Sequence, residues 1–150
     1  MGRLTTLAGP VYLDTNVFIY ALEGLDAFSS ELAGLFSLIQ TASLQAVTSE
    51  LTLAEVLVKP LSNNRTDLCS MFEETLRTSA GLQMVPITRE ILLNAAQLRA
   101  MSGVKLPDAI HIATALTAGC STFLTNDKDM AIPSELGVVY LSEVASDLNK

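Results

Sequence analysis

The stretch VYLDTNVF, residues 11–18, decides the fold, because an aspartate follows an apolar run whose residues favour a β-strand. An ionised carboxylate is costly to bury, so Asp14 needs compensation from its surroundings. In open parallel sheets, functional groups collect in the crevice outside the carboxyl ends of the strands. We therefore expect Asp14 to end the first strand and to face such a crevice.

Outward from this stretch, short β-prone runs alternate with longer helical patterns, and no repeat or low-complexity segment interrupts them. The strands are nearly continuous apolar runs, which is typical of a parallel sheet covered on both faces. We predict one α/β domain over residues 1–150, with a central parallel β-sheet flanked by α-helices in three layers. Strands are expected near 11–14, 45–48, 83–87, 122–125 and 138–141, and helices near 29–42, 50–59, 65–79, 88–102 and 107–118, with Pro60 and Gly103 among the breaks.

Composition limits the possible functions. Hydrophobic residues make up 49% of the 150-residue chain and charged residues 17%, which is enough apolar material for one buried core. Nine Lys and Arg against sixteen Asp and Glu give a net charge of −7, which disfavours an extended DNA-binding face. A local acidic cluster that holds divalent cations would reverse the field where a nucleic acid binds.

Histidine and cysteine are scarce. With one histidine and two cysteines, a His-rich zinc site or a disulfide framework is hard to build, so any metal is expected to be a hard cation held by oxygen. The cysteine usage fits a reducing compartment. No cleavable leader pattern opens the chain, and no apolar run approaches the roughly 20 residues that a bilayer requires. We expect a cytoplasmic protein without a membrane partner.

Four carboxylates are candidates for one site: Asp14, Glu55, Asp108 and Asp127. Each also has a structural explanation. Asp14 can cap the helix that VFIYAL suggests, and Glu55 lies three residues after Thr52, as in a capping box. Asp108 follows a proline at a helix start, and Asp127 can be a turn residue.

The four acids together are harder to explain by structure alone. Glu55 stands in the apolar helix LTLAEVLV, and Lys59, four residues on, is the only helical neighbour of opposite charge. Acids that converge without basic partners repel one another and raise their own pKa values. A divalent cation removes this conflict, and oxygen ligands of this kind suit Mg²⁺ or Mn²⁺.

The chain resembles the PIN-domain proteins, and within them it is similar to the VapC-type toxin ribonucleases of toxin–antitoxin modules. The resemblance rests on three segments in order: VYLDTNVFIYAL, SELTLAEVLVKPL and KLPDAIHIATALTAGCSTFLTNDKDM. It implies metal-dependent endonucleolytic cleavage of RNA, a protein antitoxin that blocks the pocket, and a homodimer.

The resemblance also implies roles for single residues. Asp14, Glu55, Asp108 and Asp127 would form the metal pocket, and Asn16 and Thr125 would line or orient it. Many relatives have a basic or neutral residue where this chain has Asp127, followed by a further acid. Asp129 is therefore a candidate to share or take over that role, although Asp127 directly follows the TN pair.

His111, three residues after Asp108, is expected to be a packed, hydrogen-bonded core histidine rather than a general acid. Two other functions compete with the nuclease. A PIN-like scaffold without catalysis would serve only as a binding module. A haloacid-dehalogenase-like phosphatase also begins with an apolar strand ending in Asp, but it usually has a second Asp at the position that Asn16 holds here.

Overall fold

The sheet is fully parallel, and it is described here from a computed structural model of residues 7–24 and 28–143. Its strand order is β3-β2-β1-β4-β5. Each predicted strand is present, with ends that differ from the expected ones by two residues or fewer. The strands are β1 (Val11–Leu13), β2 (Ala46–Ser49), β3 (Leu82–Val85), β4 (Thr122–Thr125) and β5 (Gly137–Tyr140).

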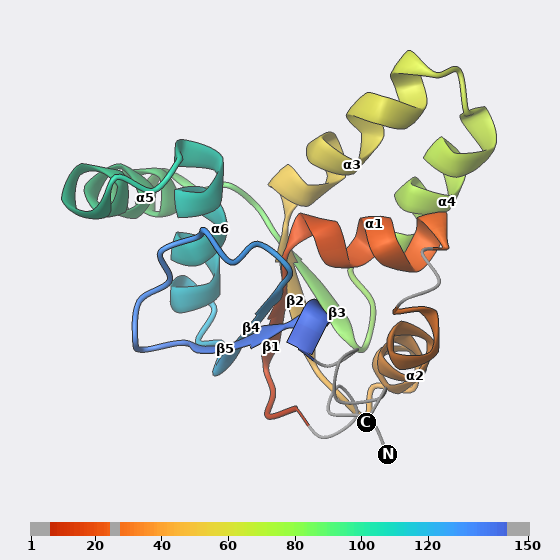
Figure 1. The fold of residues 1–150 in the computed structure, drawn as a ribbon, viewed down its shortest axis with the longest axis horizontal. Coiled ribbons are helices and arrows are strands. Elements are labelled where there is room, and N and C mark those ends of the chain that lie inside the picture. Colours follow the sequence, from red (N-terminus) through yellow and green to blue (C-terminus); the bar gives the residue numbers. More distant parts are fainter. Residues whose placement is uncertain (1–6, 25–27, 144–150) are drawn as a thin grey trace.

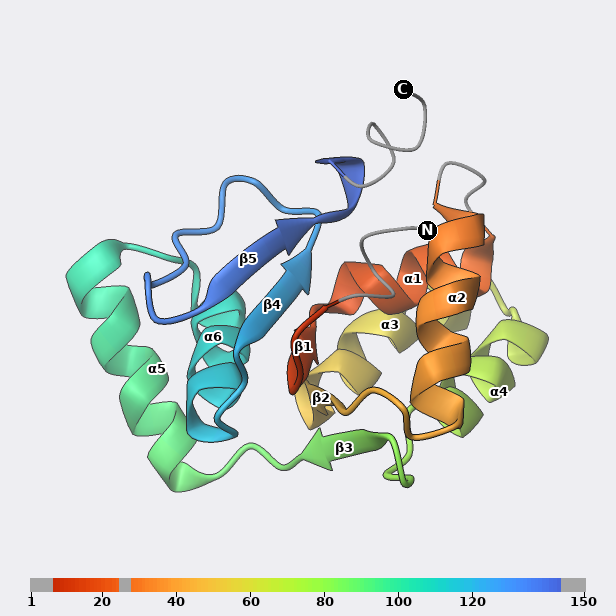
Figure 2. The same cartoon turned by 90° about the horizontal axis from the view of Figure 1, so that it is seen from below.

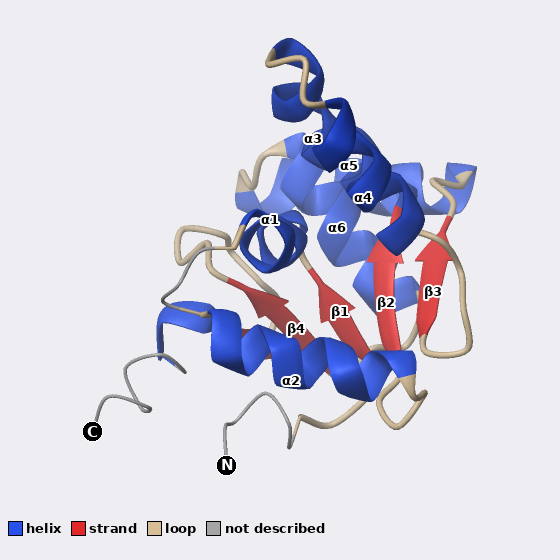
Figure 3. Cartoon of the chain, turned by 90° about the vertical axis from the view of Figure 1, so that its right-hand side faces the viewer, coloured by secondary structure: helices blue, strands red, loops and turns tan. Residues whose placement is uncertain are grey.

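Helices cover both faces of the sheet, as the apolar strands predicted. Figures 1 and 2 show α5 and α6 on one side of the sheet and α1 to α4 on the other. Figure 3 shows α2 lying across the strands near the end of the sheet opposite α1 and α3. The helices are α1 (Thr15–Glu23), α2 (Ser29–Gln40), α3 (Glu50–Ser62), α4 (Thr66–Thr75), α5 (Arg89–Ser102) and α6 (Leu106–Thr117). The three-layer α/β/α prediction is confirmed.

Strand β1 is buried on both faces and divides the core in two. Side chains alternate along a strand, so Val11 and Leu13 pack into the cluster under α1 to α4, whereas Tyr12 packs into the cluster under α5 and α6. The Tyr12 ring stacks on Phe123 of β4, with ring centroids 5.0 Å apart. This placement carries the Tyr12 hydroxyl toward α6, which matters for the site below.

Two helix ends differ from the sequence-based prediction by more than two residues. Helix α3 continues through Pro60 to Ser62 instead of ending at residue 59, because a proline near the helix end removes only one hydrogen bond before the helix stops. Helix α4 ends at Thr75 instead of 79, since the hydroxyls of Thr78 and Ser79 accept backbone N–H groups of β3 instead. Gly103 ends α5 in the left-handed conformation, as predicted.

None of the described helices is both long and apolar enough to cross a bilayer.

Candidate functional site

The candidate site lies where the order in which strands are added to the sheet reverses. From β1 the chain builds outward through β2 to β3, and it then returns to the other side of β1 with β4 and β5. The crevice at such a switch point, outside the carboxyl ends of the strands, is the usual ligand site of an open parallel sheet. Asp14 follows β1 directly, and Thr125 is the last residue of β4. The prediction that Asp14 ends the first strand is confirmed.

Asp14 is held by donors from both strand ends. Its Oδ1 accepts the Thr15 amide at 2.9 Å, so it caps α1. Its Oδ2 accepts the Thr125 hydroxyl at 2.7 Å and the Asn16 amide nitrogen at 3.3 Å. The side chain is 6% exposed. The capping explanation is therefore correct, and it describes the same residue that the site requires.

Asn16 and Thr125 also hold each other and the following loop. Asn16 Nδ2 lies 3.3 Å from the Thr125 hydroxyl, and Asn16 Oδ1 accepts the backbone N–H of Asn126 at 3.2 Å. The Thr125 hydroxyl accepts the backbone N–H of Asp127 at 3.1 Å. Both polar residues that the resemblance singled out thus join the end of β1 to the loop after β4.

Glu55 reaches the same place from α3. Its Oε1 accepts the Thr15 hydroxyl at 2.7 Å and lies 2.6 Å from His111 Nε2. Burial raises the pKa of Glu55, but the hydrogen bonds from His111 and Thr15 outweigh burial and leave that pKa lowered. Glu55 therefore stays ionised in the folded protein.

The structural explanation offered for Glu55 is wrong. The N-cap of α3 is Ser49, whose hydroxyl accepts the Leu51 amide, so Thr52 lies inside the helix and forms no capping box. The Thr52 hydroxyl instead pairs with that of Thr48. Lys59 is exposed and does not pair with Glu55, because the docking of α6 brings His111 to the carboxylate instead.

His111 is buried and hydrogen-bonded, as expected, but its bonds run to the site. Its side chain is 1% exposed, and Nε2 lies 3.9 Å from Asp14 Oδ1 in addition to its contact with Glu55. Nδ1 is 2.6 Å from the Tyr12 hydroxyl. Sequence reasoning missed Thr15 and Tyr12 and left His111 aside. The spacing from Asp108 was the one available signal, since it put His111 on the same helix face as a candidate acid.

Asp108 and Asp127 line an open cavity of about 230 Å³ together with Asp129 and Lys105. Asp108 stands in the first turn of α6, after Pro107, as predicted. Burial raises its pKa, and the negative charges of Asp14 and Asp127 raise it further. The Asp127 carboxylate accepts the Asp129 amide at 3.0 Å, so the turn explanation also describes it correctly.

The structure therefore brings Asp14, Glu55, Asp108 and Asp127 to one end of the sheet. Within residues 7–24 and 28–143, no Lys or Arg forms an ion pair with any of them, although Lys105 lines the cavity beside Asp108 and Asp127. His111 lies 3.9 Å from Asp14 and 2.6 Å from Glu55. The site therefore gathers four carboxylates that have no ion pair with a Lys or Arg of the described residues.

The donor set fits a hard divalent cation. No three Asp, Glu, His or Cys side chains of the described residues are grouped tightly enough to hold an ion by themselves. Mg²⁺ does not need such a cage, because it usually keeps several waters and binds through one or two carboxylates plus substrate oxygens. The mutual repulsion that raises the pKa of Asp108 is what a bound cation would relieve.

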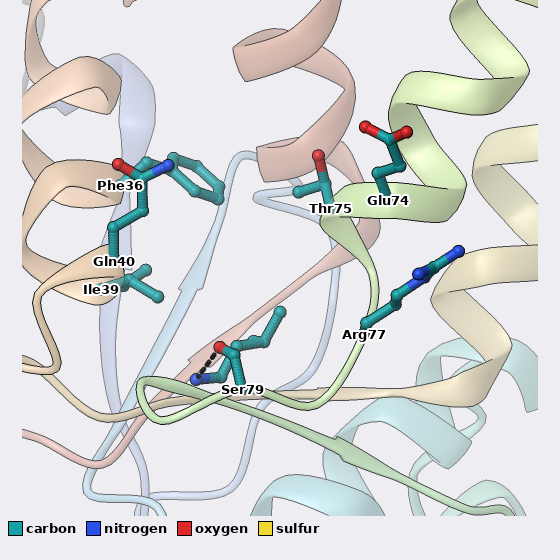
Figure 4. Close-up of a pocket in the computed structure, with 8 residues that line it drawn as sticks. Phe36, Ile39, Gln40, Glu74, Thr75, Arg77 and Ser79 are labelled. Atoms are coloured by element: carbon teal, nitrogen blue, oxygen red, sulfur yellow. Dashed lines mark hydrogen bonds between the residues drawn. The ribbon is translucent and has the colours of Figure 1, made fainter.

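A larger pocket lies away from these acids. It measures about 300 Å³ and is lined by residues of α2, α4, the loop before β3 and the first residue of β3. Figure 4 shows its labelled residues, with Phe36 and Ile39 opposite Glu74, Thr75 and Arg77, and the hydrogen bond that Ser79 forms. Its lining brings one carboxylate and one guanidinium near apolar side chains, without a convergence of like charges. Size alone therefore does not mark the candidate site.

The chain belongs to the PIN domain family, whose family model matches residues 11–135. The family part of the resemblance is thus confirmed. That the domain extends over all of 1–150 stays a prediction.

Solved structures with the same fold come from toxin–antitoxin systems. A chain of a toxin–antitoxin complex from Klebsiella pneumoniae is 23% identical, with a TM-score of 0.64 over 87% of this chain and 97% of that chain. A chain of VapBC2 from Rickettsia felis, bound to a DNA fragment from its promoter, is 16% identical, with a TM-score of 0.63 and coverage of 87% and 97%. A chain of FitAB bound to an IR36 DNA fragment is 20% identical, with a TM-score of 0.66 and coverage of 87% and 94%. A search of curated proteins found no match.

Proposed function

We propose that this PIN-domain protein is a metal-dependent endoribonuclease, the toxin of a toxin–antitoxin pair. The observation that carries the proposal is the convergence of Asp14, Glu55, Asp108 and Asp127 at the switch point of the sheet without an ion pair to a Lys or Arg of the described residues. An uncompensated acidic cluster suits the binding of Mg²⁺ or Mn²⁺, and a phosphodiester is a substrate on which such ions act. The similarity in fold to chains from toxin–antitoxin complexes supports the biological role.

In this proposal, each acid has a task that its surroundings favour. The bound ion would lower the pKa of a water molecule and neutralise the scissile phosphate. Asp14 and Asp108 would hold the ion, one from the end of β1 and the other from the start of α6. Glu55 would hold a second ion or orient the attacking water as a general base, for which its lowered pKa keeps it ionised. Asp127 would accept hydrogen bonds from water around the ion.

The proposed binding partners are inferred from the same negative charge of the site. An RNA substrate would approach an acidic site only when cations are bound there. An antitoxin would block the site by inserting a basic side chain among the carboxylates, which form no ion pair with a described Lys or Arg of their own chain. We also propose a homodimer, consistent with exposed apolar side chains on α5 and α6. These are Leu92, Leu93, Met101, Leu106 and Leu116.

The test is cleavage of a mixed pool of structured RNAs by purified protein with Mg²⁺, with Mn²⁺ and with EDTA, beside the variant Asp14→Asn. Asparagine is a good helix cap, so the variant is expected to fold. Without the charge that attracts the ion, cleavage should fall at least about a hundredfold, which is roughly 3 kcal/mol of transition-state stabilisation. Equal cleavage by the variant and the wild-type protein would refute the site. If neither protein cleaves RNA with Mg²⁺, with Mn²⁺ or with EDTA, the result would favour a non-catalytic scaffold.

A further inference from the structure

The two carboxylate oxygens of Glu55 have different surroundings. Oε1 accepts the Thr15 hydroxyl and lies within hydrogen-bond distance of His111 Nε2, at 2.7 and 2.6 Å. No hydrogen bond reaches Oε2 from the part of the chain that the structure describes. The side chain is 33% exposed, so one oxygen is anchored while the carboxylate still meets solvent.

His111 is itself anchored on the side away from Glu55. Its Nδ1 lies 2.6 Å from the hydroxyl of Tyr12, and neither side chain is more than 1% exposed. Burial and the charge of Asp14 raise the pKa of Tyr12 well above its usual value, so the phenol keeps its proton. A protonated phenol can donate to Nδ1, which leaves a ring proton on Nε2, the nitrogen that faces the Glu55 carboxylate at 2.6 Å.

From this geometry we propose that His111 is a positioning residue of the site. Tyr12 holds the imidazole with a proton on Nε2, and this N–H, together with the Thr15 hydroxyl, holds Oε1 of Glu55 so that Oε2 alone is offered to a divalent cation or its water. The inference rests on the proposed function in one respect, the role of Glu55 at a metal site. It adds a chain of contacts, from Tyr12 through His111 to Glu55, that orients a carboxylate before any ion arrives.

The arrangement differs from ordinary packing of a core histidine. For a histidine that only fills space, any hydrogen-bond partners are sufficient. A positioning residue instead needs a hydrogen-bond donor at the place of Nε2. Glutamine can put its amide nitrogen near that place, while the shorter asparagine puts its nitrogen near the place of Nδ1. His111→Gln should therefore keep the function that His111→Asn loses.

The first measurement reads the tautomer directly, without metal. The chain has a single histidine, so protein labelled with ¹⁵N-histidine gives one imidazole and needs no assignment. At neutral pH we expect a protonated Nε2 and an unprotonated Nδ1. Tyr12→Phe removes the donor to Nδ1 but keeps the ring on Phe123, and it should mix the two tautomers. A proton on Nδ1 in the wild-type protein, or a spectrum that Tyr12→Phe does not change, would overturn the inference.

The second measurement is Mn²⁺ affinity, by the EPR signal of free Mn²⁺, for the wild-type protein and the two His111 variants. We expect His111→Asn to weaken binding about tenfold, the usual loss when a group that orients a metal ligand is removed, and His111→Gln to weaken it about threefold or less. Thermal unfolding is measured beside it. Equal affinity in all three proteins, or equal losses in both variants matched by equal losses of stability, would leave His111 a structural residue and overturn the inference.

Tyr12→Phe gives a third variant that is expected to fold even where a His111 variant does not. It should weaken Mn²⁺ binding about threefold or more, whereas the matched control Tyr140→Phe, on the edge strand β5, should change neither affinity nor tautomer. Unchanged affinity in Tyr12→Phe would overturn the inference. A wild-type protein that neither binds Mn²⁺ nor cleaves RNA would instead refute the proposed function, whatever the tautomer.

Discussion

The acidic site has two halves that differ in how firmly the protein holds them. In the braced half, Asp14 and Glu55 accept hydrogen bonds from residues of β4, α1 and α6. In the open half, Asp108 and Asp127 line a cavity, and the one hydrogen bond that the described residues give to their carboxylates comes from a turn amide. The pKa of Glu55 is lowered, and the pKa of Asp108 is raised.

The difference shows which carboxylates the protein holds in place before a ligand binds. Hydrogen bonds to an ionised carboxylate stabilise the charge and fix the side chain, whereas burial near like charges does the opposite. The braced half is therefore ready before a ligand binds, and the open half is the part whose energy a cation changes most.

The largest expected effect is stabilisation by the cation itself. At a free Mg²⁺ or Mn²⁺ concentration of about 100 times Kd, binding to the folded protein should add roughly 2.7 kcal/mol, or about 5 to 10 °C in Tm. Differential scanning fluorimetry with and without EDTA measures it. Asp14→Asn should lose the shift, and a shift of equal size in that variant would place the ion elsewhere.

The next effect comes from breaking the braced half. The buried Thr125 hydroxyl donates to Asp14 and accepts from Asn16, so the nearly isosteric Thr125→Val should cost about 1 to 3 kcal/mol of unfolding free energy. Thr114→Val is a matched control, because among the described residues that buried hydroxyl bonds only a carbonyl of its own helix. Urea denaturation measures both variants, and equal losses would mean that Thr125 does not brace Asp14.

A smaller effect separates two acids of the loop after β4. Asp127 is close enough to raise the pKa of Asp108, whereas Asp129 is exposed and is not among the charges that do so. Asp127→Asn should lower the rate of metal-dependent RNA cleavage about tenfold, equivalent to about 1.4 kcal/mol, and Asp129→Asn by less than about twofold. The reverse order would assign the role to Asp129.

The smallest effect is the contribution of each shifted pKa to the unfolding free energy, which has opposite signs at pH 7 in the two halves of the site. The lowered pKa of Glu55 contributes stability above its unfolded value of 4.5, and this is lost as the pH falls through the folded pKa. The raised pKa of Asp108 contributes stability only at acid pH, and this is lost as the pH rises through the folded pKa.

Without metal at pH 7, Glu55→Gln should therefore lower the unfolding free energy, and Asp108→Asn should raise it. Each change should be about 1 kcal/mol or less, because solvent screens both partly exposed groups. Thermal unfolding in EDTA at pH 7 and at pH 4 measures both variants. If the two substitutions change the unfolding free energy in the same direction at pH 7, the distinction between the halves is removed.

Much of this arrangement could be predicted locally. The apolar runs located the strands, and the position of Asp14 after the first of them placed it at the crevice. Pro107 marked the start of α6 and hence the place of Asp108. Local patterns were less reliable where two of them competed: Thr52 imitated a capping box although Ser49 caps α3, and Pro60 did not end the helix in which it lies.

The sequence by itself determined the fold class, the strand and helix positions and a set of oxygen donors suited to a hard cation, because periodicity and capping act over a few residues. Only the tertiary structure decided which groups brace which acids. Thr15 and Glu55 are 40 residues apart, His111 and Glu55 are 56 apart, and Tyr12 and His111 are 99 apart. These contacts depend on the strand order and on how α3 and α6 dock beside β1, and no local pattern encodes either.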